Sequence, residues 1–355
     1  MAPLQVSTTN NGGENMATPS QTGKPTPERI FSTLIAYQQS EALKAAINLD
    51  IFTKIGEGAE EAPALAKAVG ASERGTRILA DYMTIQGFLT KEGTHYKLTP
   101  ESAIFLDKRS PAYMGAMAGF LGAPHHRENF GNLTEIVRKG TTIAGEGSNL
   151  APHDEFWVAF ARSMGGMATL GAQFIAGLIG SAEGKPVKVL DIAAGHGMFG
   201  VTIARMNPNA QIVALDWPNV LAVAEENAKK FGVADRWTKK AGSAFEAEYG
   251  EGYDYILLTN ILHHFDHAGN VKLMKRVHAA LKPGGKAVTL EFVPNPDRVS
   301  PPVPAAFSLV MLANTDSGDA YTFKELDKIF SEAGFSRTVA HPIAEMPQTV
   351  LVSEK

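Results

Sequence analysis

The stretch VLDIAAGHGMFG, residues 189–200, predicts a buried strand, a glycine turn and the start of a helix. Residues 187–192 form a short apolar run rich in β-branched side chains, as expected of a strand covered on both faces of a parallel sheet. Gly195 and Gly197 allow a tight turn and let a ligand approach the backbone where no Cβ stands in the way. The next predicted strand ends at Asp216, whose carboxylate can accept hydrogen bonds from both hydroxyls of a ribose. The stretch therefore predicts a nucleoside-binding crevice at the carboxyl ends of these strands.

Asp191, which precedes the glycine turn, helps to identify the nucleoside ligand. Gly195, Gly197 and Gly200 spell G-x-G-x-x-G, a pattern also found at NAD and FAD sites. Asp191 favours another ligand, because a carboxylate four residues before the first glycine would repel a pyrophosphate. A ligand with an amino group and a sulfonium, both cationic, would be stabilised by the same carboxylate. An NAD-dependent oxidoreductase stays open as the alternative.

Composition excludes several classes of protein. The 355 residues are enough for two domains, and the net charge of -4 gives no general attraction to nucleic acid or to anionic membranes. The chain has no cysteine, which excludes disulfides, thiolate zinc sites and a cysteine nucleophile. No apolar run has the length of a membrane span, and the N-terminus does not resemble a secretory signal. We therefore expect a cytoplasmic protein.

The N-terminal part predicts a tail and a helical domain. Residues 1–27 are rich in Thr, Ser, Asn, Gly and Pro, which predicts a disordered tail. Residues 28–110 fit a winged helix, with helices at 62–69 and after the capping residue Ser72, and a hairpin over 87–98 that turns at 92–93.

A winged helix suggests either DNA binding or dimerisation. The predicted recognition helix carries only two arginines, Arg74 and Arg77, and acids at Glu73 and Asp81 offset them. Proteins that read a DNA groove concentrate positive charge on that helix. We therefore favour a dimerisation domain and a homodimer that binds neither nucleic acid nor membrane. A winged-helix regulator without enzymatic activity that has kept the nucleoside-binding fold is the rival hypothesis.

The rest of the chain divides into a linker and a sheet domain. Residues 111–182 are predicted to be helical, apart from a loop over 139–149, and to contribute to an acceptor pocket. Residues 183–355 alternate strands and helices, including strands at 236–241, 255–258, 287–292 and 349–353. This order predicts a doubly wound sheet with right-handed crossovers. The segment LKPGGK, residues 281–286, predicts a helix end and a turn before the next strand.

Several motifs occur together in one order, and with them the chain resembles a known family. D-x-A-x-G-x-G at 191–197 resembles motif I of class I S-adenosylmethionine (SAM) methyltransferases, with Ala193 where glycine is usual. With GSAF at 242–245, NILHHFD at 260–266 and LKPGGK, residues 28–355 resemble the small-molecule O-methyltransferases of the caffeate and hydroxyindole type. The resemblance implies an α/β fold with a Rossmann-like, mostly parallel, doubly wound sheet behind a winged-helix dimerisation domain. It also implies SAM as the cofactor.

The resemblance assigns cofactor-binding positions at the ends of the predicted strands. Gly195 and Gly197 would pass the methionine part of SAM, Asp216 would hold the ribose and Trp217 would lie against the adenine. Ser243 stands where many relatives have an aspartate, which implies weaker or water-mediated contact with the adenine amino group. The full set that the resemblance implies is Asp191, Ala193, Gly195, Gly197, Asp216, Trp217, Gly242, Ser243, Ala244, Phe245 and Thr259.

The resemblance also places a general base at His263. A phenol with a pKa of about 10 is mostly protonated at neutral pH, whereas a histidine with a pKa of about 6.5 can take its proton as the new bond forms. Glu291 matches one of the family's two acids that flank the base, and Ala320, next to Asp319, stands at the other position. His264 stands where relatives with a phenolic acceptor usually have an aspartate. C- or N-methylation of an already nucleophilic acceptor would need less of a base and is the alternative.

The acceptor pocket and a possible metal site complete the expectations. His263, His264 and His267 lie close in sequence, but adjacent residues at a strand end point to opposite sides, so we predict no metal. His125 and His126 are weaker candidates for the pocket. The implied acceptor is small, flat and largely apolar, and the residues expected to bind it are Phe120, Phe160, Met164, Asn260, Phe307, Met311 and Asn314.

Overall fold

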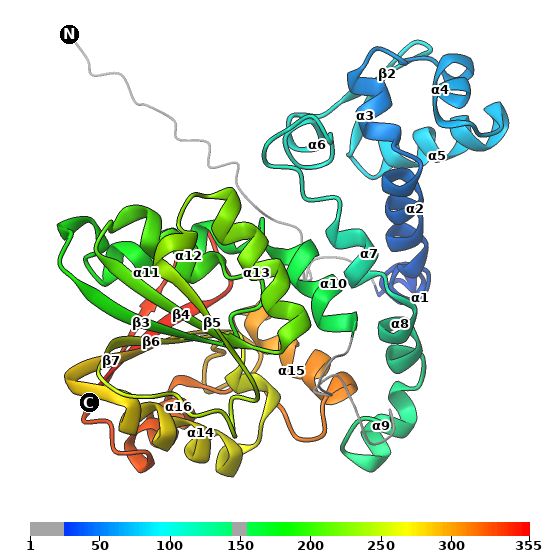
Figure 1. Ribbon diagram of the computed structural model, residues 1–355. Helices are drawn as coiled ribbons and strands as arrows, with labels where there is room; N and C mark the ends of the chain where they lie inside the picture. The colour runs from blue at the N-terminus through cyan, green and yellow to red at the C-terminus, as the bar shows by residue number, and fades with distance from the viewer. Residues whose placement is uncertain (1–24, 144–154) are drawn as a thin grey trace, which may run out of the picture.

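A seven-stranded sheet forms the centre of the C-terminal part of the computed structural model, which describes residues 25–143 and 155–355 (Figure 1). Its strand order is β5-β4-β3-β6-β7-β9-β8. The pairings among β5, β4, β3, β6 and β7 are all parallel, and the two pairings of β9 are antiparallel. The predicted fold class, a mostly parallel doubly wound sheet, is confirmed. The strands are β3 (Val187–Ile192), β4 (Ala210–Asp216), β5 (Trp237–Ala241), β6 (Tyr253–Thr259), β7 (Leu281–Glu291), β8 (Arg337–Pro342) and β9 (Thr349–Glu354).

Helices cover both faces of this sheet. Along β3, Val189 packs into one core with α11 (Ala168–Leu178), α12 (Met198–Met206) and α13 (Pro218–Lys230). Its neighbour Leu190 packs into the other core, with α14 (His267–Ala280) and α16 (Phe323–Glu332). Successive side chains of a strand point to opposite faces, so a strand buried on both sides must be apolar throughout. Figure 1 shows the two helical layers above and below the sheet.

Two features of the sheet differ from the sequence prediction. The antiparallel strand β8 was not predicted, and β7 starts at Leu281 rather than at residue 287. Leu281 pairs with Tyr253, and the next pair is Lys286 with Tyr255, so the residues between them bulge out of the ladder. Gly284 has a φ of 74°, which a bulge of this kind readily uses. LKPGGK is therefore an irregular part of a strand rather than a turn before it.

The N-terminal part is helical with one hairpin. Tyr96 of the hairpin is buried in a core with Phe52, Leu65 and Met83 from three of the helices. Ser72 caps its helix as predicted, because its Oγ accepts a hydrogen bond from the Gly75 N–H at 3.1 Å. The hairpin turns one residue later than predicted, since residues 92 and 95 form its last pair. The elements are α1 (Glu28–Leu34), α2 (Tyr37–Asn48), α3 (Ile51–Gly56), α4 (Ala62–Val69), α5 (Glu73–Ile85), β1 (Leu89–Glu92), β2 (His95–Leu98) and α6 (Pro100–Phe105).

Short helices connect the two parts of the chain. The linker contains α7 (Met117–Leu121), α8 (Pro124–Gly131), α9 (Leu133–Lys139) and α10 (Glu155–Met164), and α15 (Pro302–Asn314) packs against α8 and α9. Most of the predicted tail, and the predicted loop from residue 144 onward, lie outside the described residues. We propose the division of the chain into residues 28–110, 111–182 and 183–355. None of the helices in the described ranges has the length and apolarity needed to cross a membrane.

Candidate active site

The glycine turn follows β3 and has an unusual backbone. Ala193, Gly195 and Gly197 have φ values of 53°, 57° and 71°, the left-handed region that favours glycine. A Cβ added at Gly197 would lie 2.8 Å from the Cβ of Ala224, so the turn packs too closely for any other residue. The Gly195 N–H donates to Asp216 Oδ2 at 2.8 Å and so ties the turn to the end of β4.

Asp216 is positioned by the backbone on both sides. Its Oδ2 accepts from Gly195, and its Oδ1 accepts from the Trp217 N–H at 2.7 Å. Burial raises the pKa of this carboxyl to about 6, although the two N–H donors oppose the shift. An ionised carboxylate has about four acceptor positions, so two stay available for ribose hydroxyls.

Asp191 lies beneath the turn, fully buried. Its Oδ2 accepts from the Gly200 N–H in the first turn of α12 at 3.2 Å, while Oδ1 has no hydrogen-bond partner in the described part of the chain. Burial raises the pKa of this carboxyl to about 8. A buried carboxylate oxygen without a partner is unfavourable unless a cation lies nearby or a proton is bound. This orphaned oxygen beside a cradle of glycines fits a ligand that carries positive charge.

The other expected cofactor residues lie along the same edge of the sheet. The Gly242 N–H donates to the carbonyl of Asp216, and Ser243 Oγ accepts from the Phe245 N–H at 3.1 Å. Phe245 meets the ring of Phe265 edge-on, with ring centroids 4.8 Å apart. Trp217 packs against a small buried cluster that includes Ala161 of α10. Trp217 directly follows β4, residues 242–245 follow β5, and the buried Thr259 ends β6.

His263 and Glu291 form a buried pair at the ends of β6 and β7. His263 lies in the short 3-10 helix η3 (Leu262–His264), and Glu291 is the last residue of β7. The distance from His263 Nδ1 to Glu291 Oε2 is 2.6 Å, and the two residues are 5% and 3% exposed. Glu291 Oε1 accepts from the N–H groups of Ile261 and Leu262 at 3.1 and 2.8 Å. A carboxylate accepts, so the proton lies on Nδ1, which leaves Nε2 of the neutral ring as an acceptor.

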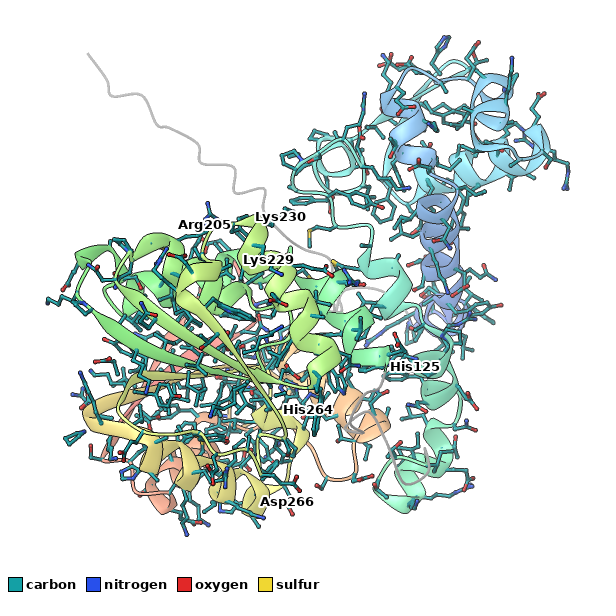
Figure 2. The ribbon with its side chains drawn as sticks, viewed as in Figure 1. His125, Arg205, Lys229, Lys230, His264 and Asp266 are labelled. Carbon is teal, nitrogen blue, oxygen red and sulfur yellow. The ribbon has the colours of Figure 1, made fainter. Side chains whose placement is uncertain are left out.

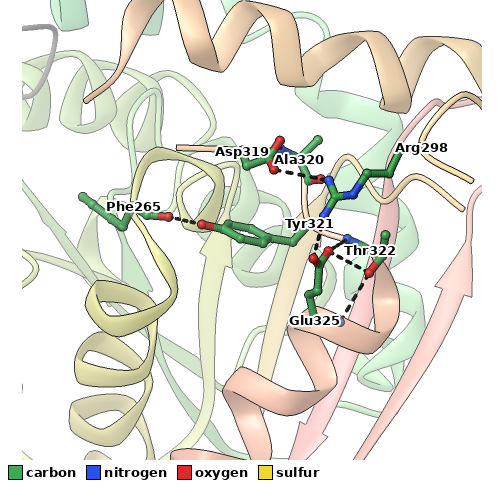
Figure 3. A network of polar contacts seen from close by, with 7 residues as sticks. All are labelled: Phe265, Arg298, Asp319, Ala320, Tyr321, Thr322 and Glu325. Atoms are coloured by element: carbon green, nitrogen blue, oxygen red, sulfur yellow. Dashed lines mark hydrogen bonds and ion pairs between the residues drawn. The ribbon is translucent and has the colours of Figure 1, made fainter. Parts of the chain in front are cut away.

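The second acid expected beside the base is absent. Ala320 is fully buried, and the carboxylate of Asp319 binds Arg298 Nη1 at 3.2 Å (Figure 3). Among the residues that the structure describes, a single carboxylate, that of Glu291, therefore orients the side chain of His263.

His264 lies next to the base in an aromatic environment. Its ring centroid is 4.5 Å from that of His263 and 5.6 Å from that of Trp157 on α10. Its buried Nδ1 has no hydrogen-bond partner within residues 25–143 and 155–355, and burial holds the pKa of the ring well below its usual value. His267 instead pairs with Glu332 at 2.9 Å. The described residues contain no group of three or more His, Asp or Glu side chains arranged to hold a metal ion.

Only some of the residues expected to bind the acceptor lie beside these histidines. Phe307 of α15 lies edge-on to His263 at 4.9 Å and stacks on Phe292 at 4.0 Å. Phe120 contacts Phe160 on α10, and Met311 is buried on α15. Met164 lies at the end of α10 and is half-buried.

The side chains of Asn260 and Asn314, which were expected to contact the acceptor, form hydrogen bonds within the protein. Asn314 Oδ1 accepts from Asn129 Nδ2 at 3.0 Å and lies 3.2 Å from His126 Nδ1. Asn260 Oδ1 accepts from Gln348 Nε2 at 2.7 Å, and Asn260 has a φ of 57°. Both side chains therefore have partners from distant parts of the sequence.

The sequence made His126 only a weak candidate for the pocket and gave His264 no role, yet ring contacts connect both to the base. A series of contacts runs from His263 through His264, Trp157 and Phe156 to His126, and Figure 2 marks His264 on the sheet side and His125 on the α8 side. The only sign of these contacts in the sequence was the presence of two adjacent pairs of histidines, at 125–126 and 263–264. Nothing in the sequence pointed to Tyr321, which donates to the carbonyl of Phe265, or to Arg298, which donates to the carbonyl of Ala320.

Comparisons with known proteins identify the family of this chain. Residues 162–336 match the family model of the O-methyltransferase domain, and residues 31–108 match the O-methyltransferase dimerisation domain. A solved structure from Nostoc punctiforme, provisionally named an O-methyltransferase, is 47% identical with a TM-score of 0.90, over 94% of this chain and 100% of that one. The tetracenomycin polyketide synthesis 8-O-methyl transferase of Streptomyces glaucescens is 27% identical over 93% of this chain and 97% of its own length. The human N-acetylserotonin methyltransferase, solved with SAM, shares the fold at 21% identity with a TM-score of 0.82, over 95% and 99% of the two chains. The chain therefore belongs to the O-methyltransferase family and is a SAM-dependent methyltransferase with an N-terminal dimerisation domain.

Proposed function

We propose that this protein methylates a hydroxyl group of a small, flat, largely apolar aromatic acceptor, with His263 as the general base. The observation that carries the proposal is the buried contact of 2.6 Å between His263 Nδ1 and Glu291 Oε2. Family membership decides against the NAD-dependent oxidoreductase and against a regulator without enzymatic activity.

The chemistry follows from this pair. When bound, SAM would supply an electrophilic methyl group, whose bond to sulfur breaks as the bond to oxygen forms, with S-adenosylhomocysteine as the leaving group. His263 Nε2 accepts the hydroxyl proton of the acceptor as the new C–O bond forms, and the positive charge that develops on the ring is stabilised by Glu291. Glu291 cannot rotate away without losing two backbone N–H donors. A general base of this kind contributes roughly 10² to 10⁴ in rate.

The cofactor site in this proposal is the edge formed by the ends of β3 to β6. Asp216 would hold the ribose, and Gly195 and Gly197 would give the methionine part room beside the backbone. Trp217 and Phe245 would contact the adenine. Asp191 would stabilise the positive charge of the ligand from beneath the turn, since its buried Oδ1 has no other partner among the described residues.

The acceptor site in this proposal lies between η3, α10 and α15. Phe307 supplies an aromatic wall beside His263, and Phe120 and Phe160 extend the apolar surroundings. The buried Nδ1 of His264 and Nε2 of His126 have no hydrogen-bond partner in the described ranges, so each would bind a polar group of the acceptor. Burial lowers the pKa of both rings, which leaves them uncharged at neutral pH and suits an uncharged acceptor.

The proposal is tested by a screen of phenols, hydroxyindoles and quinols with labelled SAM. We expect His263→Ala to lower turnover at least 100-fold while SAM binding, measured by calorimetry, stays as in the wild type. His267→Ala is the matched control, because that exposed histidine pairs with Glu332 outside the site. Equal turnover by the wild type and His263→Ala would remove His263 from the mechanism.

Methylation at carbon is the second candidate. One relative, the L-tyrosine C(3)-methyltransferase of Streptomyces lavendulae, is 24% identical over 91% of both chains. A base oriented by one carboxylate instead of two also suits a ring carbon activated by an ionised hydroxyl. Mass spectrometry and NMR of the product would distinguish an O-methyl from a C-methyl group.

We further propose a homodimer in the cytoplasm. The dimerisation-domain match and the exposed apolar side chains of α1 support the homodimer. The cytoplasmic location stays a prediction from the sequence.

A further inference from the structure

The loop formed by residues 318–322, here called the clamp loop, packs against the segment that carries the base. The Asp319 N–H donates to the carbonyl of His263 at 3.0 Å, and the Tyr321 hydroxyl donates to the carbonyl of Phe265 at 2.5 Å. A Cβ added at Gly318 would overlap the carbonyl oxygen of His263, so the two backbones are in close contact. The clamp loop therefore fixes the backbone on both sides of residue 264.

The clamp loop is itself held at several points (Figure 3). Arg298 donates to the Asp319 carboxylate at 3.2 Å, to the carbonyl of Ala320 at 3.4 Å and to Glu325 at 2.5 Å. Glu325 also completes the capping box of α16 with Thr322. One arginine thus joins the segment after β7, the clamp loop and the start of α16.

The clamp loop is also fixed to the helix that faces the base. The Gly318 N–H donates to Thr315 Oγ1 at 2.9 Å, and the Thr315 hydroxyl donates to the carbonyl of Met311 on α15. The same helix presents Phe307 to the ring of His263. A shift of the clamp loop would therefore move the base relative to the aromatic wall.

Ala320 stands where the second acid of the base is expected. We infer that the clamp loop takes over the positioning role of that acid through the backbone of His263 and Phe265, with Tyr321 as the positioning residue. The inference rests on His263 being the base. Glu291 controls the rotation of the imidazole through Nδ1, and the clamp loop controls where the residue's backbone lies. Burial and the carboxylates of Asp319, Asp266 and Glu325 raise the pKa of Tyr321 to about 12, so its hydroxyl stays protonated and donates.

Other contacts to the same segment do not replace this one. Asn270 Nδ2 donates to the carbonyls of Leu262 and Phe265 at 2.9 and 3.1 Å. Those bonds come from α14, on which Asn270 is fully buried. Tyr321 is half-buried and joins Phe265 to the loop that follows α15. Loss of its hydroxyl would weaken the connection between the segment and the clamp loop at Phe265, while the bonds from α14 and the bond from the Asp319 N–H to His263 remain.

Tyr321→Phe tests the inference, because it removes the hydroxyl and keeps the ring. Tyr253→Phe is the matched control, since the Tyr253 hydroxyl also donates to a backbone carbonyl, that of Tyr249 at 2.7 Å, at the opposite end of β6. We expect similar shifts of the urea midpoint in the two variants. With S-adenosylhomocysteine bound, we expect the downfield proton resonance of His263 Nδ1–H to broaden only in Tyr321→Phe.

Kinetics provide the second measurement, with the hydroxyarene that the wild type turns over fastest. We expect kcat of Tyr321→Phe to fall about tenfold with little change in KM for the acceptor or for SAM, as for a misplaced reacting group. If the resonance and kcat of Tyr321→Phe match those of Tyr253→Phe, the inference is wrong. A fully active His263→Ala would instead overturn the proposed base, so the two failures are distinguishable.

Discussion

At the scale of single residues, Ala193 has a backbone conformation that alanine rarely adopts. Its φ of 53° places it in the left-handed region, where a residue with a Cβ costs about 1–3 kcal/mol. Ala193→Gly would remove this strain, although the more flexible unfolded chain and the lost methyl contact offset part of the gain. We therefore expect the free energy of unfolding in urea, without SAM, to rise by about 0.5–1 kcal/mol.

The neighbouring alanine is the control for this prediction. Ala194 is buried and is not among the residues with positive φ, so Ala194→Gly should destabilise the protein by roughly 1 kcal/mol. Equal destabilisation by the two changes would show that Ala193 carries no strain.

Asp191 makes the stability of the cofactor-free protein depend on pH. Its pKa is raised by burial to about 8 in the folded state, against about 3.9 in an unfolded chain. The folded state therefore keeps a proton that the unfolded state releases, and stability present at acid pH is lost as the pH rises towards 8. An asparagine at this position cannot ionise, so we expect the wild type to lose stability relative to Asp191→Asn by about 1 kcal/mol per pH unit between pH 5 and 8.

Binding of SAM should show the opposite dependence on the same group. A cationic ligand favours the carboxylate, so the SAM affinity of the wild type should rise between pH 7 and 8, and that of Asp191→Asn should stay flat over this range, which lies above the pKa of about 6 of Asp216. Calorimetry at several pH values measures both. Parallel pH profiles for the two proteins would mean that Asp191 is ionised without the cofactor.

At the scale of elements, the sequence predicted the strands and helices whose buried side chains form a regular apolar pattern. The strand of residues 187–192 and the helices around residues 198–206 and 323–332 follow directly from such patterns. Strand β8 was missed because RTVAHP is only half-buried at the sheet edge, where no strong pattern is needed. The start of β7 was missed because a bulge allows Pro and Gly inside a strand.

The part of the candidate site that lies at the ends of strands was predictable from the sequence, whereas the part formed by the clamp loop was not. Asp216, His263 and Glu291 end strands or follow them directly, so the order of strands along the chain brings them to one edge of the sheet. The clamp loop lies outside any strand, and its contacts with η3 depend on how α15 turns back towards the sheet. No local pattern in the sequence encodes a hydrogen bond between residues 56 positions apart, such as that from Tyr321 to Phe265.

At the scale of the whole molecule, the linker joins the N-terminal part to the site. Lys44 of α2 donates to the carbonyl of Gly122 at 2.6 Å, just after α7. On α10, Arg162 makes two hydrogen bonds to Glu226 of α13 at 2.8 and 3.0 Å. Asn129 of α8 reaches Asn314 on α15. The position of the N-terminal helices is thereby connected to the helices that flank the candidate acceptor site.

The N-terminal helices also carry the surface on which the proposed homodimer would form. Five large apolar side chains within eight consecutive residues are 49–69% exposed, and large groups of exposed apolar side chains in soluble proteins often mark an interaction site. A second copy would remove this surface from water, which is the main driving force for association. We expect Phe31→Glu combined with Leu34→Glu to convert a dimer into a monomer in light scattering and sedimentation. The side chains of the patch are Ile30, Phe31, Leu34, Ile35 and Tyr37.

A matched change elsewhere shows whether the position of the patch matters. Val299 is 74% exposed on a loop of the catalytic part, so Val299→Glu adds charge at an equally exposed apolar site and should leave the dimer intact. If both proteins stay dimeric, the interface lies on another surface, and a monomeric wild type would refute the homodimer itself. If the α1 variant is a folded monomer, its turnover measures the effect of dimerisation on the site, because the hydrogen bonds that join α2 through the linker to α15 remain in each subunit.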